Sequence, residues 1–207
     1  MRGLAQVITL VIAGIGLCGC VSADGDLSAI PQDHPVRRAS YSAPSLGRPG
    51  QDAAPPSGYV AFCDRNPEEC RVPRGAPAQL TLTDDIKARL EDVNMAVNRS
   101  IRPSDDSMHY GVAEFWTVPI DGYGDCEDYV LAKRKMLMLL GLPEPALRIS
   151  VVLNIARVRH AVLTVVTDRG ELVLDNLKDD IVAPSDTGYV WLERQDPLSR
   201  TGWIALN

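Results

Sequence analysis

The stretch Gly122-Tyr-Gly-Asp-Cys-Glu-Asp-Tyr129 decides how this chain folds. It places Cys126 after a glycine-containing turn and at the start of a segment rich in Met, Leu, Ala, Lys and Arg, which are good helix formers. Gly141 and Pro143 then end that segment. The sequence therefore predicts a helix over 126–140 with a cysteine in its first turn.

A cysteine in this position is chemically distinctive. The amide groups at a helix N-terminus are unpaired and the helix dipole is positive there, so a thiolate is favoured. Such placement can lower a cysteine pKa from about 8.5 to about 3.5–7.5, and the same amides can form an oxyanion hole. The carboxylates of Asp125, Glu127 and Asp128 act in the opposite direction. The pattern therefore requires a nearby cation: an imidazolium, a metal ion, or both.

The other four cysteines fall into two pairs. Cys18 and Cys20 belong to the N-terminal segment. Cys63 and Cys70 enclose a short loop that closes readily as a disulfide in an oxidising compartment. The alternatives are two free thiols or half of a metal site, but no second Cys/His pair has zinc spacing. Cys126 is left without a partner, which makes it a candidate nucleophile or, alternatively, a small buried apolar residue.

The segments on either side of the cysteine helix indicate the fold class. A helix is expected over 83–99, with Thr83 as its cap and an apolar stripe that includes Leu90 and Val97. Strand-like runs follow the cysteine helix at 148–153, 160–167, 171–175, 189–192 and 202–206. Helices followed by antiparallel strands predict an α+β domain. Within the cysteine helix, the run Lys133-Arg134-Lys135 is expected to form a solvated face.

His160 and Asp175 are the candidate partners of the thiol. His160 opens one strand and Asp175 ends the next, after the turn signal Asp168-Arg169-Gly170. A two-residue loop at Asp168-Arg169 would place Asp175 diagonal to His160 on the same face of the sheet, whereas other loops would separate the two side chains. The alternatives are a strand-edge histidine and a turn carboxylate. The spacing permits a Cys126–His160–Asp175 triad and leaves the register open.

Three separated motifs around the candidate triad residues, together with two upstream elements, resemble the bacterial transglutaminase-like cysteine peptidases, which include the LapG-type periplasmic proteases. The matching segments, in chain order, are Phe62-Cys63 with Cys70, Trp116 with Pro119, Gly124-Asp-Cys-Glu-Asp-Tyr129 with Ala132-Lys133-Arg134, His160-Ala-Val-Leu163 and Leu174-Asp-Asn176. The resemblance covers about 60–191. It implies a papain- or transglutaminase-like core in which the cysteine helix packs on an antiparallel sheet that carries the histidine and the aspartate.

The resemblance also implies an activity and a cofactor. Cys126 would attack a scissile carbonyl, His160 would move the proton, and Asp175 would hold the imidazole. Asp125 and Glu127, with help from Asp128, would bind Ca²⁺, which prefers oxygen ligands; alternatively, these acids only stabilise the helix N-terminus. The expected partners are a protein substrate, such as a large surface adhesin, and a membrane receptor that restrains the protease.

Two other functions remain open at this stage. Exported Cys-His enzymes also act on the cell wall as amidases or transpeptidases, and the triad residues do not distinguish hydrolysis from transfer to an amine. A catalytically silent, calcium-responsive binding protein is the alternative outside enzymes. Nucleic acid is an unexpected partner, because the net charge is −6 and basic residues are not clustered.

The N-terminal part predicts export. Residues 1–20 have the basic start and short apolar run of a signal peptide. Leu17-Cys-Gly-Cys20 resembles a lipobox, which would leave Cys20 lipidated, whereas Val21-Ser-Ala23 suits ordinary signal peptidase. Residues 21–57 are rich in Pro, Ser and Ala and are expected to be a disordered tether. The folded domain is expected over 58–207, in the periplasm and, with the first processing site, on a lipid anchor.

Overall fold

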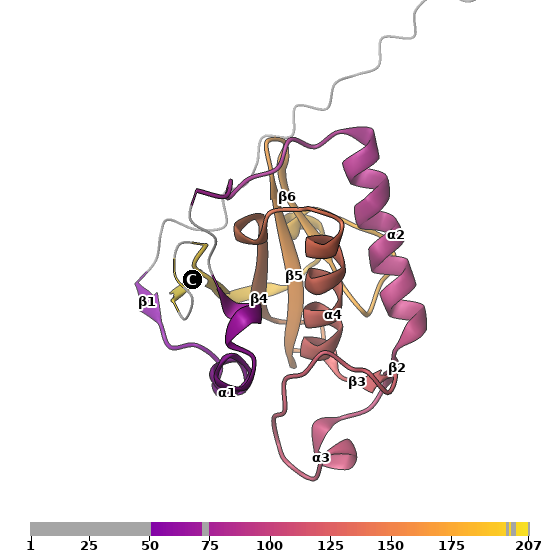
Figure 1. Cartoon of the computed structure of the whole chain (residues 1–207), viewed down its shortest axis with the longest axis vertical. Helices are drawn as coiled ribbons and strands as arrows, with labels where there is room; N and C mark the ends of the chain where they lie inside the picture. The colour runs from indigo at the N-terminus through magenta and orange to yellow at the C-terminus, as the bar shows by residue number, and fades with distance from the viewer. Residues whose placement is uncertain (1–50, 72–74, 198, 200–201, 207) are drawn as a thin grey trace, which may run out of the picture. The chain divides into compact units, whose positions relative to one another are not determined.

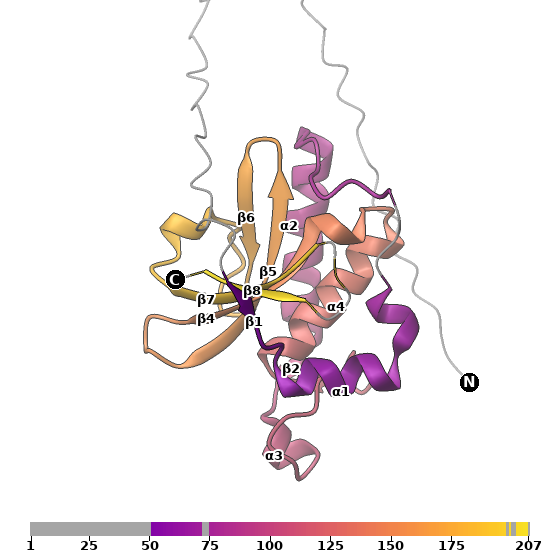
Figure 2. The ribbon, with the colours of Figure 1, turned by 90° about the vertical axis from the view of Figure 1, so that its left-hand side faces the viewer.

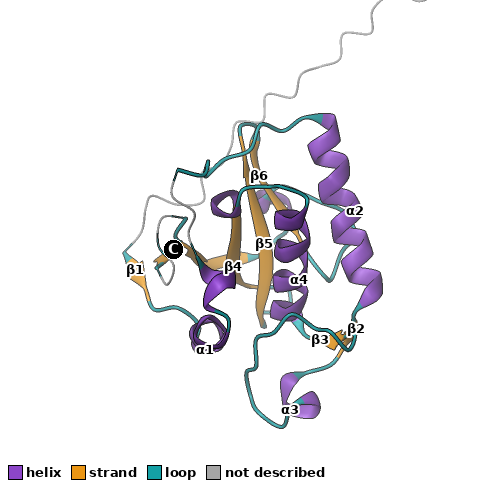
Figure 3. Cartoon of the chain, in the orientation of Figure 1, coloured by secondary structure: helices purple, strands orange, loops and turns teal. Residues whose placement is uncertain are grey.

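The fold was obtained as a computed structural model that describes residues 51–71, 75–197, 199 and 202–206. The predicted signal peptide, the lipidation site at Cys20 and the tether up to residue 50 lie outside these residues. Within the described ranges, no helix has the length and apolar character needed to cross a membrane. The secondary structure is helical in its first half and mainly β in its second half, as the sequence predicts (Figure 3).

A mixed set of long and short strands forms the central sheet. Within the described residues this sheet has six strands in the order β1-β8-β7-β4-β5-β6, and every neighbouring pair is antiparallel. The strands are β1 (Asp52–Ala53), β4 (Leu147–Leu153), β5 (Arg159–Thr167), β6 (Gly170–Leu174), β7 (Val190–Gln195) and β8 (Trp203–Ala205). The five strand runs that the sequence predicts correspond to β4 through β8.

Two long helices cover one face of the sheet. They are α2 (Asp84–Ser100) and α4 (Cys126–Leu139), and α4 packs on both β5 and α2 (Figures 1 and 2). Thr83 caps α2 by accepting a hydrogen bond from Ile86 N, as expected. Shorter elements are α1 (Ser57–Arg65), α3 (Asp106–His109), the 3-10 helices η1 (Pro67–Cys70), η2 (Glu144–Ala146) and η3 (Pro184–Asp186), and the parallel pair β2 (Arg102–Pro103) and β3 (Tyr123–Gly124).

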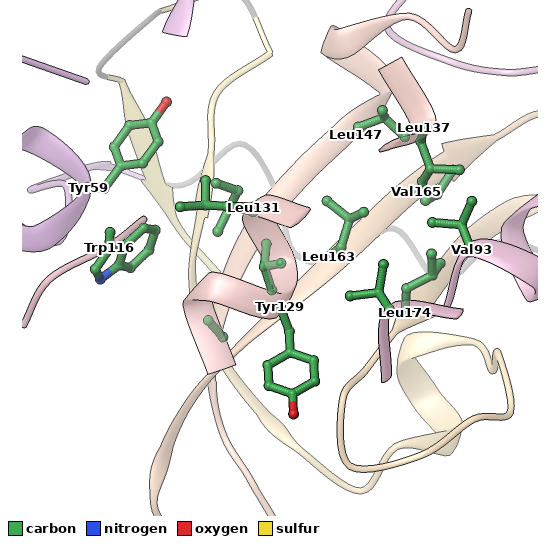
Figure 4. Close-up of a cluster of buried hydrophobic side chains, with 14 of the residues drawn as sticks. Tyr59, Val93, Trp116, Tyr129, Leu131, Leu137, Leu147, Leu163, Val165 and Leu174 are labelled. Carbon is green, nitrogen blue, oxygen red and sulfur yellow. The ribbon is translucent and has the colours of Figure 1, made fainter. Parts of the chain in front are cut away.

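The main core fills the space between the sheet and these helices. Leu131 and Leu137 of α4 meet Leu163 and Val165 of β5, and Tyr59 and Trp116 extend the cluster towards α1 (Figure 4). Strand alternation sends the other residues of β5 to the opposite face. Val162 packs there with Val152 and Val173 in a second, smaller cluster. The fold is therefore the α+β class with the cysteine helix on an antiparallel sheet.

The folded part begins earlier than the sequence predicts. Asp52 pairs with Ile204, and Ala53 pairs with Trp203, so the last residues of the predicted tether form the edge strand β1. The boundary at residue 58 is corrected to residue 51 within the described chain. A two-residue edge strand is held by backbone hydrogen bonds, which need no apolar alternation and leave no pattern in the sequence.

The predicted disulfide is present. Cys63 in α1 is bonded to Cys70 at the end of η1, and both residues are buried in the main core. Cys126 is the free cysteine among the described residues.

Candidate active site

Cys126 is placed by a short pair of strands that ties α4 to the end of α2. Arg102 N donates to Gly122 O at 2.8 Å, and Ser104 N donates to Gly124 O at 3.0 Å. This parallel β2–β3 pair fixes the chain immediately before the helix. Cys126 is then the first residue of α4, as the sequence predicts.

The thiol has two polar contacts. Cys126 Sγ donates to Glu127 Oε2 at 3.1 Å and accepts from Ala161 N at 3.4 Å. Burial, followed by the negative charge of Glu127, raises the pKa of the thiol well above its ordinary value, and the Ala161 N–H acts in the opposite direction. Burial and the neighbouring carboxylates thus favour the neutral thiol, and a cation near the sulfur would act in the opposite direction.

His160 and Asp175 meet as the hairpin register requires. Leu163 pairs with Leu174 and Thr167 with Gly170, which is the register of a two-residue loop. His160 Nε2 lies 2.8 Å from Asp175 Oδ1, and both side chains are buried. The spacing in the sequence permits several registers of this hairpin, and the two-residue loop is the one in the structure.

Further donors hold Asp175. Leu177 N donates to Oδ1 at 3.0 Å, and the Tyr189 hydroxyl donates to Oδ2 at 2.6 Å. Asn98 of α2 donates to the backbone oxygen of Asp175 at 3.0 Å. Burial acts to raise the pKa of Asp175, but the hydrogen bond and charge of His160, with the other two donors, lower it below its ordinary value. Asp175 is therefore an ionised carboxylate that orients the imidazole.

Cys126 and His160 border the same cleft, whose volume is about 240 Å³. The cleft is lined by Pro56, Ser57, Glu114, Trp116, Cys126, Glu127, Val151, Arg159, His160 and Ala161. The amide that contacts the sulfur belongs to the His160–Ala161 peptide bond. The thiol is hydrogen-bonded to Glu127 and to Ala161 N, and among the described residues no hydrogen bond joins it to the imidazole. Since His160 Nε2 faces Asp175, Nδ1 is the nitrogen left for the sulfur.

Trp116 has two roles at the site. It is buried and packs edge-on against Tyr59, with ring centroids 5.7 Å apart. Its indole nitrogen donates to Glu114 at 3.0 Å, and it also borders the cleft. Trp116 is therefore a core residue that forms part of the cleft wall.

An acidic cluster lies beside the cysteine. One carboxylate oxygen from each of Asp106, Asp125 and Glu127 lies within 4.8 Å of the other two. Asp128, which the sequence groups with Asp125 and Glu127, lies outside this cluster, and its Oδ1 accepts from Thr117 N at 2.8 Å. The structure thus puts Asp106 in the place expected for Asp128. Asp106 escaped the sequence analysis because 18 residues separate it from Asp125 and no local motif links them.

These carboxylates fit a hard cation. Asp106 Oδ1 and Asp125 Oδ1 are buried without a hydrogen-bond partner. Burial raises the pKa of Asp106 and of Asp125. Burial, followed by the charge of Asp125, raises the pKa of Glu127 to about 9. Buried, unpaired, crowded oxygens are costly unless a cation offsets them, and an all-oxygen set suits Ca²⁺.

The basic run in α4 differs from its prediction. Lys133 is fully buried and Arg134 is nearly so, whereas Lys135 remains half-exposed beside Glu69. Arg134 pairs with the buried Glu144. The expectation of a solvated face was wrong because α4 is covered on two sides, by the sheet and by α2.

Comparison with known proteins identifies the family. The family described as bacterial transglutaminase-like cysteine proteinase matches residues 49–207, which include the described domain. The chain belongs to this family. The matched range also begins close to β1, in agreement with the corrected domain start. No curated protein matches the chain in a sequence comparison.

Solved structures of this proteinase family carry the same fold. Calcium-bound LapG of Legionella pneumophila is 25% identical, with a TM-score of 0.51 over 59% of this chain and 70% of that one. A second LapG structure from that organism is 26% identical, with a TM-score of 0.50 over 57% and 67% of the two chains. An EGTA-treated LapG structure gives 26% identity and a TM-score of 0.50 over 58% and 67%. The fold is thus transglutaminase-like, as the sequence predicts.

Proposed function

We propose that this protein is an exported cysteine peptidase that cleaves a protein substrate through Cys126, His160 and Asp175. One observation carries the proposal: His160 borders the cleft that contains the free cysteine, and its ring is held by a 2.8 Å contact with the buried Asp175. Membership of a cysteine proteinase family supports the same chemistry.

Cys126, His160 and Asp175 have separate roles in acyl transfer. The thiol leaves Glu127 and gives its proton to His160 Nδ1 as the sulfur attacks the scissile carbonyl carbon. The imidazolium then protonates the leaving amine, and a thioester remains on Cys126. A water molecule gives one proton to His160 and attacks the thioester, which releases the carboxylic acid and restores the thiol. Asp175 holds the ring in one tautomer and stabilises its positive charge.

The first turn of α4 supplies the remaining electrostatics. The first amides of a helix have no partner within the helix, and here they would stabilise the negative charge that develops on the carbonyl oxygen. Asp106, Asp125 and Glu127 would hold a calcium ion. Bound there, the ion supplies positive charge that offsets the carboxylates beside the sulfur. The calcium-bound relative supports this assignment.

The cleft and the N-terminal sequence also bear on the substrate and the cellular location. A cleft of this size, open to the molecular surface, suits an extended segment of a protein chain. We propose a large surface adhesin as the substrate, a membrane receptor as the regulator and the periplasm as the location. The signal-like segment at 1–20 and the lipobox-like site at Cys20 support export.

The nucleophile can be tested before the substrate is identified. Washed cells, which carry their own surface proteins, are incubated with the wild type or with Cys126→Ala, and new protein N-termini are identified by mass spectrometry. The wild type should generate a small set of new termini, and the variant none. Cys126→Ala should keep its thermal transition, because the thiol lies at a helix end beside the cleft.

Two results would contradict the proposal. Equal sets of termini from both proteins would exclude Cys126 as the nucleophile. Release of fragments from purified peptidoglycan, with no cleavage of protein, would favour the cell-wall amidase. Cleavage in ¹⁸O-labelled water distinguishes hydrolysis from acyl transfer to an amine. Hydrolysis places the label in the new carboxylate, and transfer does not.

A further inference from the structure

The two oxygens of the Asp175 carboxylate are bound from different directions. Oδ1 faces His160, whereas Oδ2 accepts the Tyr189 hydroxyl at 2.6 Å. The ring of Tyr189 stands edge-on to the imidazole, with centroids 6.0 Å apart and an interplanar angle of 88°. Tyr189 therefore contacts both members of the His–Asp pair, and the mechanism described above gives it no task.

Tyr189 is itself held by a tight turn. The Thr187 hydroxyl donates to Pro184 O at 2.7 Å and accepts from Tyr189 N at 3.1 Å. Gly188 has a φ of +72°, which permits the reversal between η3 and β7. The Tyr189 ring also packs on the second core cluster, against Val152, Val162 and Val173. A hydroxyl on a ring anchored in this way has little freedom to follow a moving carboxylate.

We propose that Tyr189 is a positioning residue of the active site, whose hydroxyl fixes the Asp175 carboxylate so that Oδ1 stays aligned with His160 Nε2. The inference rests on the proposed peptidase function and extends the triad by one residue.

The chemistry favours a positioning role. The terminal torsion of an aspartate is broad, so a carboxylate bound through one oxygen can turn and present either oxygen to its partner. A donor on Oδ2 removes that freedom, and bonds to a charged acceptor are the stronger ones. Burial, followed by the hydrogen bond to Asp175, raises the pKa of Tyr189 above its ordinary value. The hydroxyl therefore keeps its proton and remains a donor throughout the neutral range.

The test compares Tyr189→Phe with Tyr129→Phe in the full chain. Both variants lose one hydroxyl bond of similar length, because the Tyr129 hydroxyl donates to Ile101 O at 2.7 Å, away from the His–Asp pair. The first readout is the nuclear magnetic resonance signal of the His160 ring proton that points to Asp175. Tyr189→Phe should shift this signal and speed its exchange with water, whereas Tyr129→Phe should leave it as in the wild type.

The second readout is kinetic, on a peptide that spans a terminus mapped with washed cells. Loss of a bond to a charged acceptor should lower kcat by about tenfold to a hundredfold. KM should change by less than about threefold, because Tyr189 is absent from the cleft lining. An unchanged ring-proton signal and an unchanged kcat in Tyr189→Phe would overturn the proposal. If the wild type cleaves nothing but the signal responds to Tyr189→Phe alone, the peptidase assignment fails and the positioning role stands.

Discussion

Lys133 is a residue whose burial has consequences for stability. Its side chain is fully buried, and its ammonium nitrogen has no hydrogen-bond partner in the described structure. Burial lowers the pKa of Lys133 to about 7, although Asp175 and Asp179 act to raise it. Burial of a charge without a hydrogen-bonded partner is unfavourable, so the buried Lys133 ammonium lowers the free energy of unfolding.

Lys133→Met should therefore stabilise the protein, and the gain should depend on pH. Between pH 7 and the ordinary lysine pKa near 10.5, the unfolded state binds a proton that the folded state has lost, so the stability of the wild type rises with pH in this window. Below about pH 7 Lys133 is protonated in the folded state, so the full cost of burying its charge remains. Urea unfolding should give the variant an advantage of about 1–4 kcal/mol at pH 6 that shrinks towards pH 10.

The half-exposed Lys135 offers a matched control on the same helix. It pairs with Glu69, and an exposed pair of this kind contributes about 0–1 kcal/mol. Lys135→Met should therefore change stability little, and because it retains Lys133 its stability should rise with pH in the same way as that of the wild type. A destabilised Lys133→Met at pH 6 would show that the ammonium is held by favourable interactions with Asp175 and Asp179 that exceed the cost of burial.

For single residues, the sequence predicted which side chains form the triad better than it predicted which side chains are buried. His160 and Asp175 could be paired because the Asp168-Arg169 turn limits the register to a few choices. Lys133 was misplaced because a basic helical run usually faces solvent, and only the packing of α2 against α4 buries it. The contact between Tyr189 and Asp175 could not be predicted either, because it depends on where the chain between β6 and β7 turns back.

Among the elements, the β2–β3 pair controls how the cysteine helix begins. Gly124 is the last residue of β3 and lies against the first turn of α4. A Cβ atom at Gly124 would lie 2.6 Å from Asp128 Oδ2 and 2.7 Å from Asp128 Cβ. Asp128 has little room to give way, because it is fully buried and its Oδ1 is bonded to Thr117 N. The close approach of strand to helix therefore requires glycine.

Gly124→Ala should cost about 1–3 kcal/mol of stability, the usual result of overpacking a buried contact. It should also reduce cleavage, because the displaced strand leads through Asp125 alone into Cys126. The double variant with Asp128→Ala removes the obstructing side chain, so Gly124→Ala should cost less in that background. Additive costs in thermal unfolding would mean that the strain arises elsewhere.

For the whole molecule, long strands and helices were predictable and short connections were not. The helices α2 and α4 and the strands β4 to β8 have patterns long enough to recognise, and their order fixed the fold class. The domain start was misjudged because β1 has two residues and is defined by its partner β8. Asp106 lies in the four-residue helix α3, which is too short to show helical periodicity in the sequence. The pairing of β1 and the place of Asp106 beside Asp125 both depend on contacts between segments that are distant in the sequence.

The acidic cluster joins α3 to the start of α4, so a cation bound there should stabilise the entire domain. Calcium that binds only the folded state adds about 2.7 kcal/mol when its free concentration is one hundred times Kd. For a domain of this size, that corresponds to a rise in Tm of about 5–10 °C. Addition of Ca²⁺ to chelator-treated protein should raise Tm, and EGTA should reverse the change.

Isosteric variants distinguish the two candidate ligand sets. Asp106→Asn removes a charge from the cluster and should abolish most of the Ca²⁺-dependent rise in Tm. Asp128→Asn keeps an oxygen that can accept from Thr117 N and lies outside the cluster, so its response to Ca²⁺ should match that of the wild type. The reverse result would return Asp128 to the ligand set and remove Asp106. Because Tm is read without substrate, the outcome holds whatever protein the enzyme cleaves.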